Sequence, residues 1–359
     1  MVRKLGLLAC LLYSSYGITQ TVPATHYAVN YEGRSVKEYA TGSVLFNFPG
    51  STMKTQFTGT HLSVNLIGRG NHFDVLIDGQ LTDKIVTANG PDIQTFELFS
   101  SEETATVEVS LVKRTENPDA MVKVVSLDHD GFLQGLWENK PHILFIGDSI
   151  SAGFGSESNK RDCTWNEIYE TSNARLAFPY QTGEILNTSI TQVSVSGLGL
   201  IRNWSGNQPY HDLSYYADKA GAVFGGKYQF SYEDKHPDLI VIEVGTNDFS
   251  TDPQPHEPWN NIGEVREEWV ERMVEFTEQL KSRYDNTNIV YMPRPAYPYD
   301  YIIPATQEAM ATLHSKGVEG LFSHTFVSPL EGCIWHPTAT ESRDIATKLS
   351  AFIQQNELL

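Results

Sequence analysis

The amino-acid sequence predicts a small all-β domain followed by a doubly wound α/β domain with a parallel sheet. Residues 18–135 contain short apolar runs with a period of two, separated by Pro-Gly and Asp-Gly breaks. This pattern is typical of a β-sandwich or jelly roll. Residues 136–359 instead alternate apolar runs rich in branched side chains with helical patterns, which indicates a parallel sheet covered by helices. A length of 359 residues also favours two domains.

In the first domain, the predicted strands include residues 43–48, 61–67, 73–77 and 106–112. In the second domain, we expect strands at 143–146, 192–195, 239–244, 289–292 and 320–326. Apolar residues at helical spacing predict a helix over 262–280 and a last helix after His336, with Pro337 in its first turn.

The amino terminus predicts export. Arg3 and Lys4 precede an apolar run over residues 5–13, and small residues follow, so residues 1–17 are interpreted as a signal peptide. The run is too short to span a bilayer, which needs about 20 apolar residues. We therefore expect a secreted protein, extracellular or periplasmic, with no membrane partner. Lipidation at Cys10 is a weaker alternative.

Composition limits the partners. The formal net charge is −18 and the sequence pI is about 5.0, and we find no basic stripe that overrides this average. Such a surface repels phosphate backbones and polyanions, so we expect no nucleic-acid partner. Beyond the signal peptide the chain has two cysteines, Cys163 and Cys333. In an exported protein they form one disulfide or remain two buried thiols.

Four polar segments fall at the carboxyl edge of the predicted sheet. Ser149, Gly197 and Asn247 follow successive strands, and His336 precedes the last helix. Each has a structural explanation alone, such as a turn or a helix cap. Together they supply what acyl transfer needs: Ser149 as nucleophile, His336 as base, and the Ser149 and Gly197 amides with the Asn247 carboxamide as an oxyanion hole.

The order Gly147-Asp148-Ser149-Ile150-Ser151, Gly197, Gly245-Thr246-Asn247-Asp248 and His336-Pro337 resembles the SGNH hydrolases, also called the GDSL esterase superfamily, over roughly residues 141–357. Four further features resemble carbohydrate esterase family 2: the amino-terminal β domain, Asp162-Cys163 shortly after the serine, Ser196-Gly197-Leu198-Gly199-Leu200, and Gly332-Cys333-Ile334-Trp335-His336-Pro337. This resemblance implies an extracellular acetyl esterase acting on acetylated xylan or mannan without a metal. It also implies the roles already given to Ser149, Gly197, Asn247 and His336.

One departure from the superfamily concerns the residue that orients His336. An aspartate usually lies two or three residues earlier, where this chain has Ile334 and Cys333. A main-chain carbonyl of either residue can fix the Nδ1 proton and leave Nε2 as the base. The side chain of Glu331 is the alternative. Asp148 and Asp248 are expected to hold loop geometry.

Aromatic residues near these motifs are candidates for sugar contacts. We assign tentative substrate binding to Trp259 and Trp335, whereas Trp204 and Tyr210 are expected to pack in a core. No metal-ligand spacing is found, so no metal or other cofactor is predicted.

The sequence thus predicts a secreted serine esterase that removes acetyl groups from a polysaccharide or oligosaccharide. Two alternatives remain open: a lipase or thioesterase with other acyl substrates, and a non-catalytic carbohydrate-binding protein.

Overall fold

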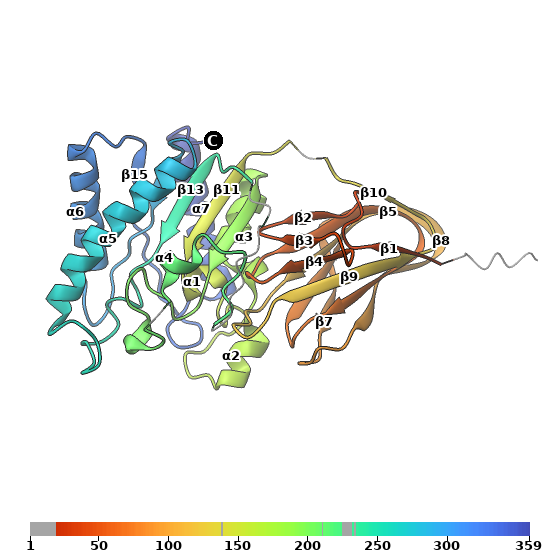
Figure 1. The fold of residues 1–359 in the computed structure, drawn as a ribbon, viewed down its shortest axis with the longest axis horizontal. Coiled ribbons are helices and arrows are strands. Elements are labelled where there is room, and N and C mark those ends of the chain that lie inside the picture. The colour runs from red at the N-terminus through yellow and green to blue at the C-terminus, as the bar shows by residue number, and fades with distance from the viewer. Residues whose placement is uncertain (1–18, 138, 210, 225–231, 233–234) are drawn as a thin grey trace, which may run out of the picture.

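The computed structural model describes residues 19–137, 139–209, 211–224, 232 and 235–359. The residues interpreted as a signal peptide, 1–17, lie outside this part of the chain, as does Tyr210. Two hydrogen-bonded sheets lie side by side along the long axis (Figure 1). The first is antiparallel and the second is parallel, which confirms the predicted fold class.

The antiparallel sheet curls around its own core, so that strands of one continuous sheet enclose the apolar interior. Its order is β3-β4-β9-β5-β8-β6-β7, with β1 paired to β9 and both β2 and β10 paired to β5. Register shifts near Gly59 and Leu62 interrupt the long pair of β5 and β8, and such bulges bend a sheet. The strands are β1 (Gln20–Pro23), β2 (Asn30–Glu32), β3 (Val36–Glu38), β4 (Ser43–Phe46), β5 (Thr52–Ile67), β6 (His72–Ile77), β7 (Gln80–Val86), β8 (Gln94–Lys113), β9 (Val122–His129) and β10 (Phe132–Gln134).

The parallel sheet has five strands in the order β12-β11-β13-β14-β15. Helices α5 and α6 cover one face, and α3 and α7 cover the other (Figure 1). The elements are β11 (His142–Gly147), α1 (Ser149–Ala152), α2 (Trp165–Thr171), η1 (Ala174–Leu176), α3 (Phe178–Leu186), β12 (Ser189–Ser194), η2 (Trp204–Gly206), α4 (Leu213–Tyr216), β13 (Leu239–Glu243), α5 (Ile262–Arg283), β14 (Asn288–Tyr291), α6 (Ile302–Ser315), β15 (Leu321–Ser323) and α7 (Ala339–Gln355).

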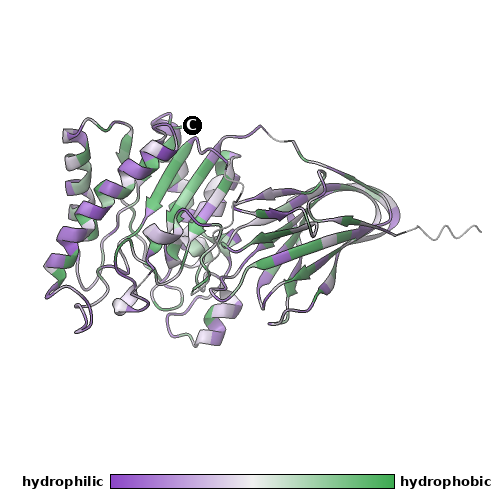
Figure 2. Cartoon of the chain, viewed as in Figure 1, coloured by the Kyte–Doolittle hydropathy of each residue, from purple (hydrophilic) through white to green (hydrophobic). Residues whose placement is uncertain are grey.

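Alternate residues of the central strands pack into two separate hydrophobic cores, one on each face of the sheet. In β11, Leu144 and Ile146 pack with α5 and α6, whereas Ile143 and Phe145 pack with α3 and α7. Both faces of the strand are therefore apolar, and β11 and β13 are almost uniformly hydrophobic in Figure 2. This continuous apolar character is what a strand buried on both faces requires.

The register aligns the carboxyl ends of three strands. Gly147 of β11 lies opposite Ser194 of β12 on one side and Glu243 of β13 on the other. The segments that follow these strands therefore begin at one edge, as the sequence predicts. Within the described residues, no helix has both the length and the apolar character needed to cross a membrane.

The end of the chain differs in one detail from the prediction. The sequence predicts Pro337 in the first turn of the last helix, but α7 begins at Ala339 and Thr338 is its N-cap. Thr338 and Glu341 form a reciprocal capping box, which fixes the helix start two residues after the proline.

Candidate active site

Ser149 begins a four-residue helix directly after β11. The preceding residue, Asp148, caps this helix by accepting a hydrogen bond from the Ile150 amide at 3.0 Å. Gly153 ends the helix in the left-handed conformation, with φ of 79°. Ser149 is only 5% exposed, so a rigid turn holds its hydroxyl in place.

The imidazole of His336 lies against this hydroxyl. The distance from His336 Nε2 to Ser149 Oγ is 2.7 Å, although the two residues are 187 positions apart in the chain. The ring of Phe154 contacts the imidazole, with centroids 4.4 Å apart. The fold thus brings together the two side chains that the sequence assigns as nucleophile and base.

The other imidazole nitrogen faces two main-chain carbonyls. His336 Nδ1 lies 2.9 Å from the oxygen of Cys333 and 2.9 Å from that of Ile334. A carbonyl only accepts, so the proton must be on Nδ1, and Nε2 is left to accept the proton of Ser149. The acceptors are therefore the predicted main-chain carbonyls, and neither is the side chain of Glu331.

This arrangement depends on an unusual backbone turn. Ile334 and Trp335 both have positive φ, 47° and 59°, which few residues other than glycine adopt. The turn is closed by a hydrogen bond from the Gly332 amide to the His336 carbonyl at 2.9 Å. This turn orients the Cys333 and Ile334 carbonyls toward the same atom, His336 Nδ1.

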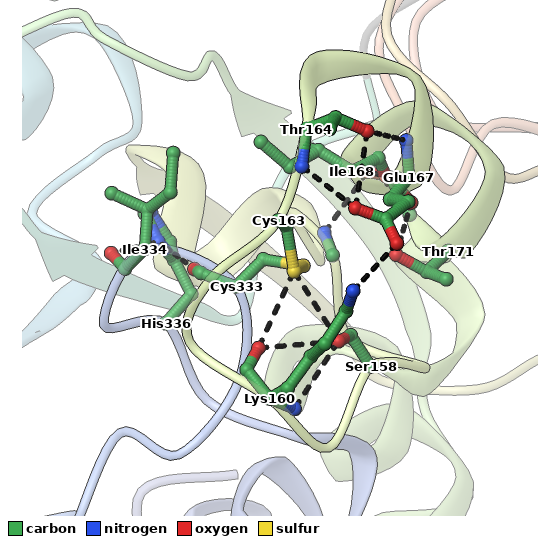
Figure 3. The surroundings of a disulfide bond; sticks show 12 residues. Ser158, Lys160, Cys163, Thr164, Glu167, Ile168, Thr171, Cys333, Ile334 and His336 are labelled. Carbon is green, nitrogen blue, oxygen red and sulfur yellow. Dashed lines mark hydrogen bonds and ion pairs between the residues drawn. A yellow bond between two sulfur atoms is a disulfide. The ribbon is translucent and has the colours of Figure 1, made fainter.

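A disulfide between Cys163 and Cys333 anchors the turn (Figure 3). The bond joins residues 170 positions apart, and it confirms the pairing proposed from the cysteine count. Arg161 adds a second anchor, because its carbonyl accepts the Ile334 amide at 2.9 Å and its guanidinium lies 3.9 Å from the centroid of the Trp335 ring. The loop that carries His336 is therefore bound to the loop that follows the serine.

The environment keeps the imidazole neutral. Burial lowers the pKa of His336 from 6.5 to about 4, the two carbonyl acceptors oppose this shift, and the cation of Arg294 adds to it. The neutral ring is the form that can act as a base.

Three hydrogen-bond donors lie in the segments named as an oxyanion hole. Within the described part of the chain, the amides of Ser149 and Gly197 have no hydrogen-bond acceptor. Gly197 has φ of 81°, and a Cβ built on it would meet nothing within 4 Å. The Asn247 carboxamide is 5% exposed and donates to the Leu198 carbonyl at 2.8 Å.

Asp248 organises the loop after β12. Its buried carboxylate accepts the amides of Leu200, Ile201 and Arg202 at 2.9–3.0 Å. Burial raises the pKa of Asp248 to about 6, and these hydrogen bonds oppose the rise. This is the loop-holding arrangement expected for Asp248.

Asp148 has a carboxyl neighbour behind the serine. It caps α1 and lies beside buried Glu243, the last residue of β13. Burial, followed by the charge of Asp148, raises the pKa of Glu243 well above its usual range.

The tryptophans occupy positions that only partly agree with the prediction. Trp335, next to His336, is 61% exposed. Trp259 packs partly against the core on the α5 face, and its indole nitrogen donates to Glu268 at 2.8 Å. The prediction that Trp204 packs in a core is wrong, since it is 51% exposed. The backbone explains this exposure. The Trp204 amide donates a hydrogen bond to the Gly197 carbonyl at 2.8 Å, which holds Trp204 on a surface loop.

Arg294 was not predicted from the sequence. It follows β14 at the same edge, donates to Thr246 Oγ1 at 3.0 Å, and acts electrostatically on His336. Its position after a parallel strand could have identified it, because the same position predicted Asn247. Among the described residues, no group of three or more His, Cys, Asp or Glu side chains is arranged to hold a metal ion.

Comparison with known proteins agrees with this architecture. Residues 31–134 match the family described as carbohydrate esterase 2 N-terminal, and residues 145–319 match the GDSL-like lipase/acylhydrolase family. A protein named acetylxylan esterase / glucomannan deacetylase, from Cellvibrio japonicus (strain Ueda107), is 28% identical over 364 residues, 98% of each chain. A second protein of that name and organism is 26% identical over 94% of this chain and 91% of its own.

The fold is also that of a solved relative. The structure of a family two carbohydrate esterase from Cellvibrio japonicus has a TM-score of 0.79 and 23% identity, covering 94% of this chain and 98% of that chain. With a family match in each domain and curated relatives aligned along nearly all its length, the chain is similar throughout to carbohydrate esterase family 2 and is a carboxylic ester hydrolase.

Proposed function

We propose that this protein removes O-acetyl groups from plant polysaccharides or oligosaccharides of the xylan or mannan type, through a Ser149–His336 dyad. The observation that carries the proposal is the 2.7 Å contact between Ser149 Oγ and a His336 Nε2 that two carbonyls keep unprotonated. This contact supports a nucleophile and a base that work with main-chain carbonyls instead of a carboxylate.

The first half of the reaction forms an acetyl-enzyme. Ser149 Oγ attacks the acetyl carbonyl carbon while its proton passes to His336 Nε2. The resulting oxyanion is stabilised by the amides of Ser149 and Gly197 and the carboxamide of Asn247. When the tetrahedral intermediate collapses, the bond to the sugar oxygen breaks, and this oxygen takes the proton from Nε2.

The second half releases acetate. A water molecule gives a proton to Nε2 and attacks the acetyl carbon, and the bond to Ser149 Oγ breaks as Oγ recovers that proton. The imidazolium that forms in each half is stabilised by the Cys333 and Ile334 carbonyls. A carbonyl stabilises this cation less than a carboxylate does, because it carries only a partial charge.

Substrate class is supported by the relatives and by the surface. The two curated relatives are named for acetylxylan and glucomannan. Exposed Trp335 beside His336 offers a flat apolar face of the kind that stacks on sugar rings. The net charge of −18 suits a neutral polymer better than a polyanion.

We also propose that the protein is secreted. The predicted signal peptide and the disulfide between Cys163 and Cys333 support this, because disulfides persist mainly outside the reducing cytosol.

The test is acetate release from acetylated xylan and acetylated glucomannan by wild type and Ser149→Ala. We expect the substitution to lower kcat by at least about 10³-fold. Ser282→Ala, at an exposed position near the end of α5, is the matched control and should retain wild-type rates. Equal rates for wild type and Ser149→Ala would contradict the mechanism. Faster turnover of butyryl or octanoyl esters than of acetyl esters would instead identify a lipase or thioesterase.

A further inference from the structure

A carboxylate from the β domain contacts the loop that contains Gly197. Glu116 belongs to residues 114–121, the connection between β8 and β9, which we call the strap. One carboxylate oxygen of Glu116 accepts the Ser196 amide at 2.7 Å, and the other accepts the Ser196 hydroxyl. Both oxygens of this side chain therefore bind a single residue, 80 positions later in the chain.

The strap is attached to the α/β domain on both sides of Glu116. Before it, the Arg114 carbonyl accepts the Ala174 amide at 2.9 Å; after it, the Pro118 carbonyl accepts the Phe224 amide at 2.7 Å. The position of Glu116 is therefore set by the interface between the domains.

The guanidinium of Arg114 strengthens this interface. It binds buried Asp74 of β6 at 2.7 Å and also Glu157, which lies in the loop after α1. The Arg114 and Asp74 side chains are almost fully buried, so separating them would leave an uncompensated buried charge. The strap is thereby held to the segment that follows the serine.

The loop after β12 is thus bound at both ends by carboxylates. Asp248 of the α/β domain holds the amides of residues 200–202, and Glu116 of the β domain holds Ser196. Between them lies Gly197, whose amide has no acceptor within the described part of the chain. The peptide plane carrying that amide also contains the Ser196 carbonyl, so fixing Ser196 restricts the direction in which the Gly197 N–H points.

We propose that Glu116 is a positioning residue that orients the Gly197 amide toward the oxyanion, so that the β domain completes the active site. This inference rests on the proposed role of Gly197 in ester hydrolysis. The ionised carboxylate accepts both hydrogen bonds, whereas the protonated form accepts the Ser196 amide with one oxygen and donates to the Ser196 hydroxyl with the other. Burial raises the pKa of Glu116, with Asp148 adding slightly, and the two bonds from Ser196 and the charge of Lys113 oppose that rise.

The experiment compares Glu116→Ala, Glu116→Gln and Ser196→Ala with wild type, using 4-nitrophenyl acetate. The oxyanion exists only in the transition state, so the loss should fall on kcat with little change in KM. Removing an oxyanion donor outright costs about 10²–10³-fold, so misorientation in Glu116→Ala should cost at least about tenfold. Glu116→Gln keeps one acceptor oxygen and should lie between Glu116→Ala and wild type.

A double-mutant cycle separates positioning from general stability. If Glu116 acts through Ser196, the double variant should be no slower than Glu116→Ala alone. Asp119→Asn, at an exposed position on the same strap, is the control and should keep wild-type kcat. Thermal unfolding of each variant shows whether it is folded; if Glu116→Ala is not, Glu116→Gln and Ser196→Ala decide the question.

Two outcomes would overturn the inference: kcat within about twofold of wild type in the folded Glu116 variants, or fully additive losses in the cycle. These two outcomes differ from those that contradict the proposed function. The proposed function fails if wild type does not hydrolyse the ester or if Ser149→Ala is as active as wild type.

Discussion

The acid limb of the pH profile tests the environment of His336 directly. Because burial lowers its pKa from 6.5 to about 4, and only the neutral ring accepts the proton of Ser149, acid should remove the base only near pH 4. At about pH 5, roughly 90% of such rings are neutral, whereas an imidazole titrating at about 6.5 is neutral in only about 3% of molecules. The two cases differ by about 30-fold in kcat/KM at that pH.

The assay is acetate release from a soluble, neutral acetylated sugar between about pH 3.5 and 8, with circular dichroism at each pH to show that the protein is folded. Burial raises the pKa of Glu116, so the scan is repeated with Glu116→Gln, which cannot titrate there. A limb near pH 4 in Glu116→Gln is the expected result. A limb near the ordinary imidazole value, in folded Glu116→Gln, would refute the reasoning.

Three further predictions concern the residues around the dyad. Replacing Cys163 and Cys333 together by serine opens a loop of 170 residues and should lower the free energy of unfolding by about 2–5 kcal/mol in a urea titration; an unchanged midpoint contradicts it. Gly197→Ala puts a Cβ on a residue with φ of 81° and should cost about 1–2 kcal/mol of stability as well as kcat, and wild-type stability and kcat would exclude the proposed geometry. Arg294→Gln removes a cation that helps lower the pKa of His336, so the acid limb should move to higher pH; no movement would show that this charge does not reach the imidazole.

Local sequence was sufficient to predict most of the fold and three parts of the site. Ser149 and Asn247 each follow a strand that is apolar on both faces, Gly197 follows the buried but partly polar strand β12, and parallel strands deliver their carboxyl ends to one edge of the sheet. The register of Gly147 with Ser194 and Glu243 shows this arrangement. Periodicity and strand order depend on residues close together in the chain, so they can be read without coordinates.

Other features were decided only by tertiary structure, because they depend on contacts between distant segments. Whether a carbonyl or Glu331 faces His336 depended on a turn with positive φ at Ile334 and Trp335, and neither residue type favours that conformation. The exposure of Trp204 depended on the loop that its amide closes onto Gly197. Glu116 reaches Ser196 from another domain, and only the packing of one domain on the other brings that carboxylate to the active-site loop.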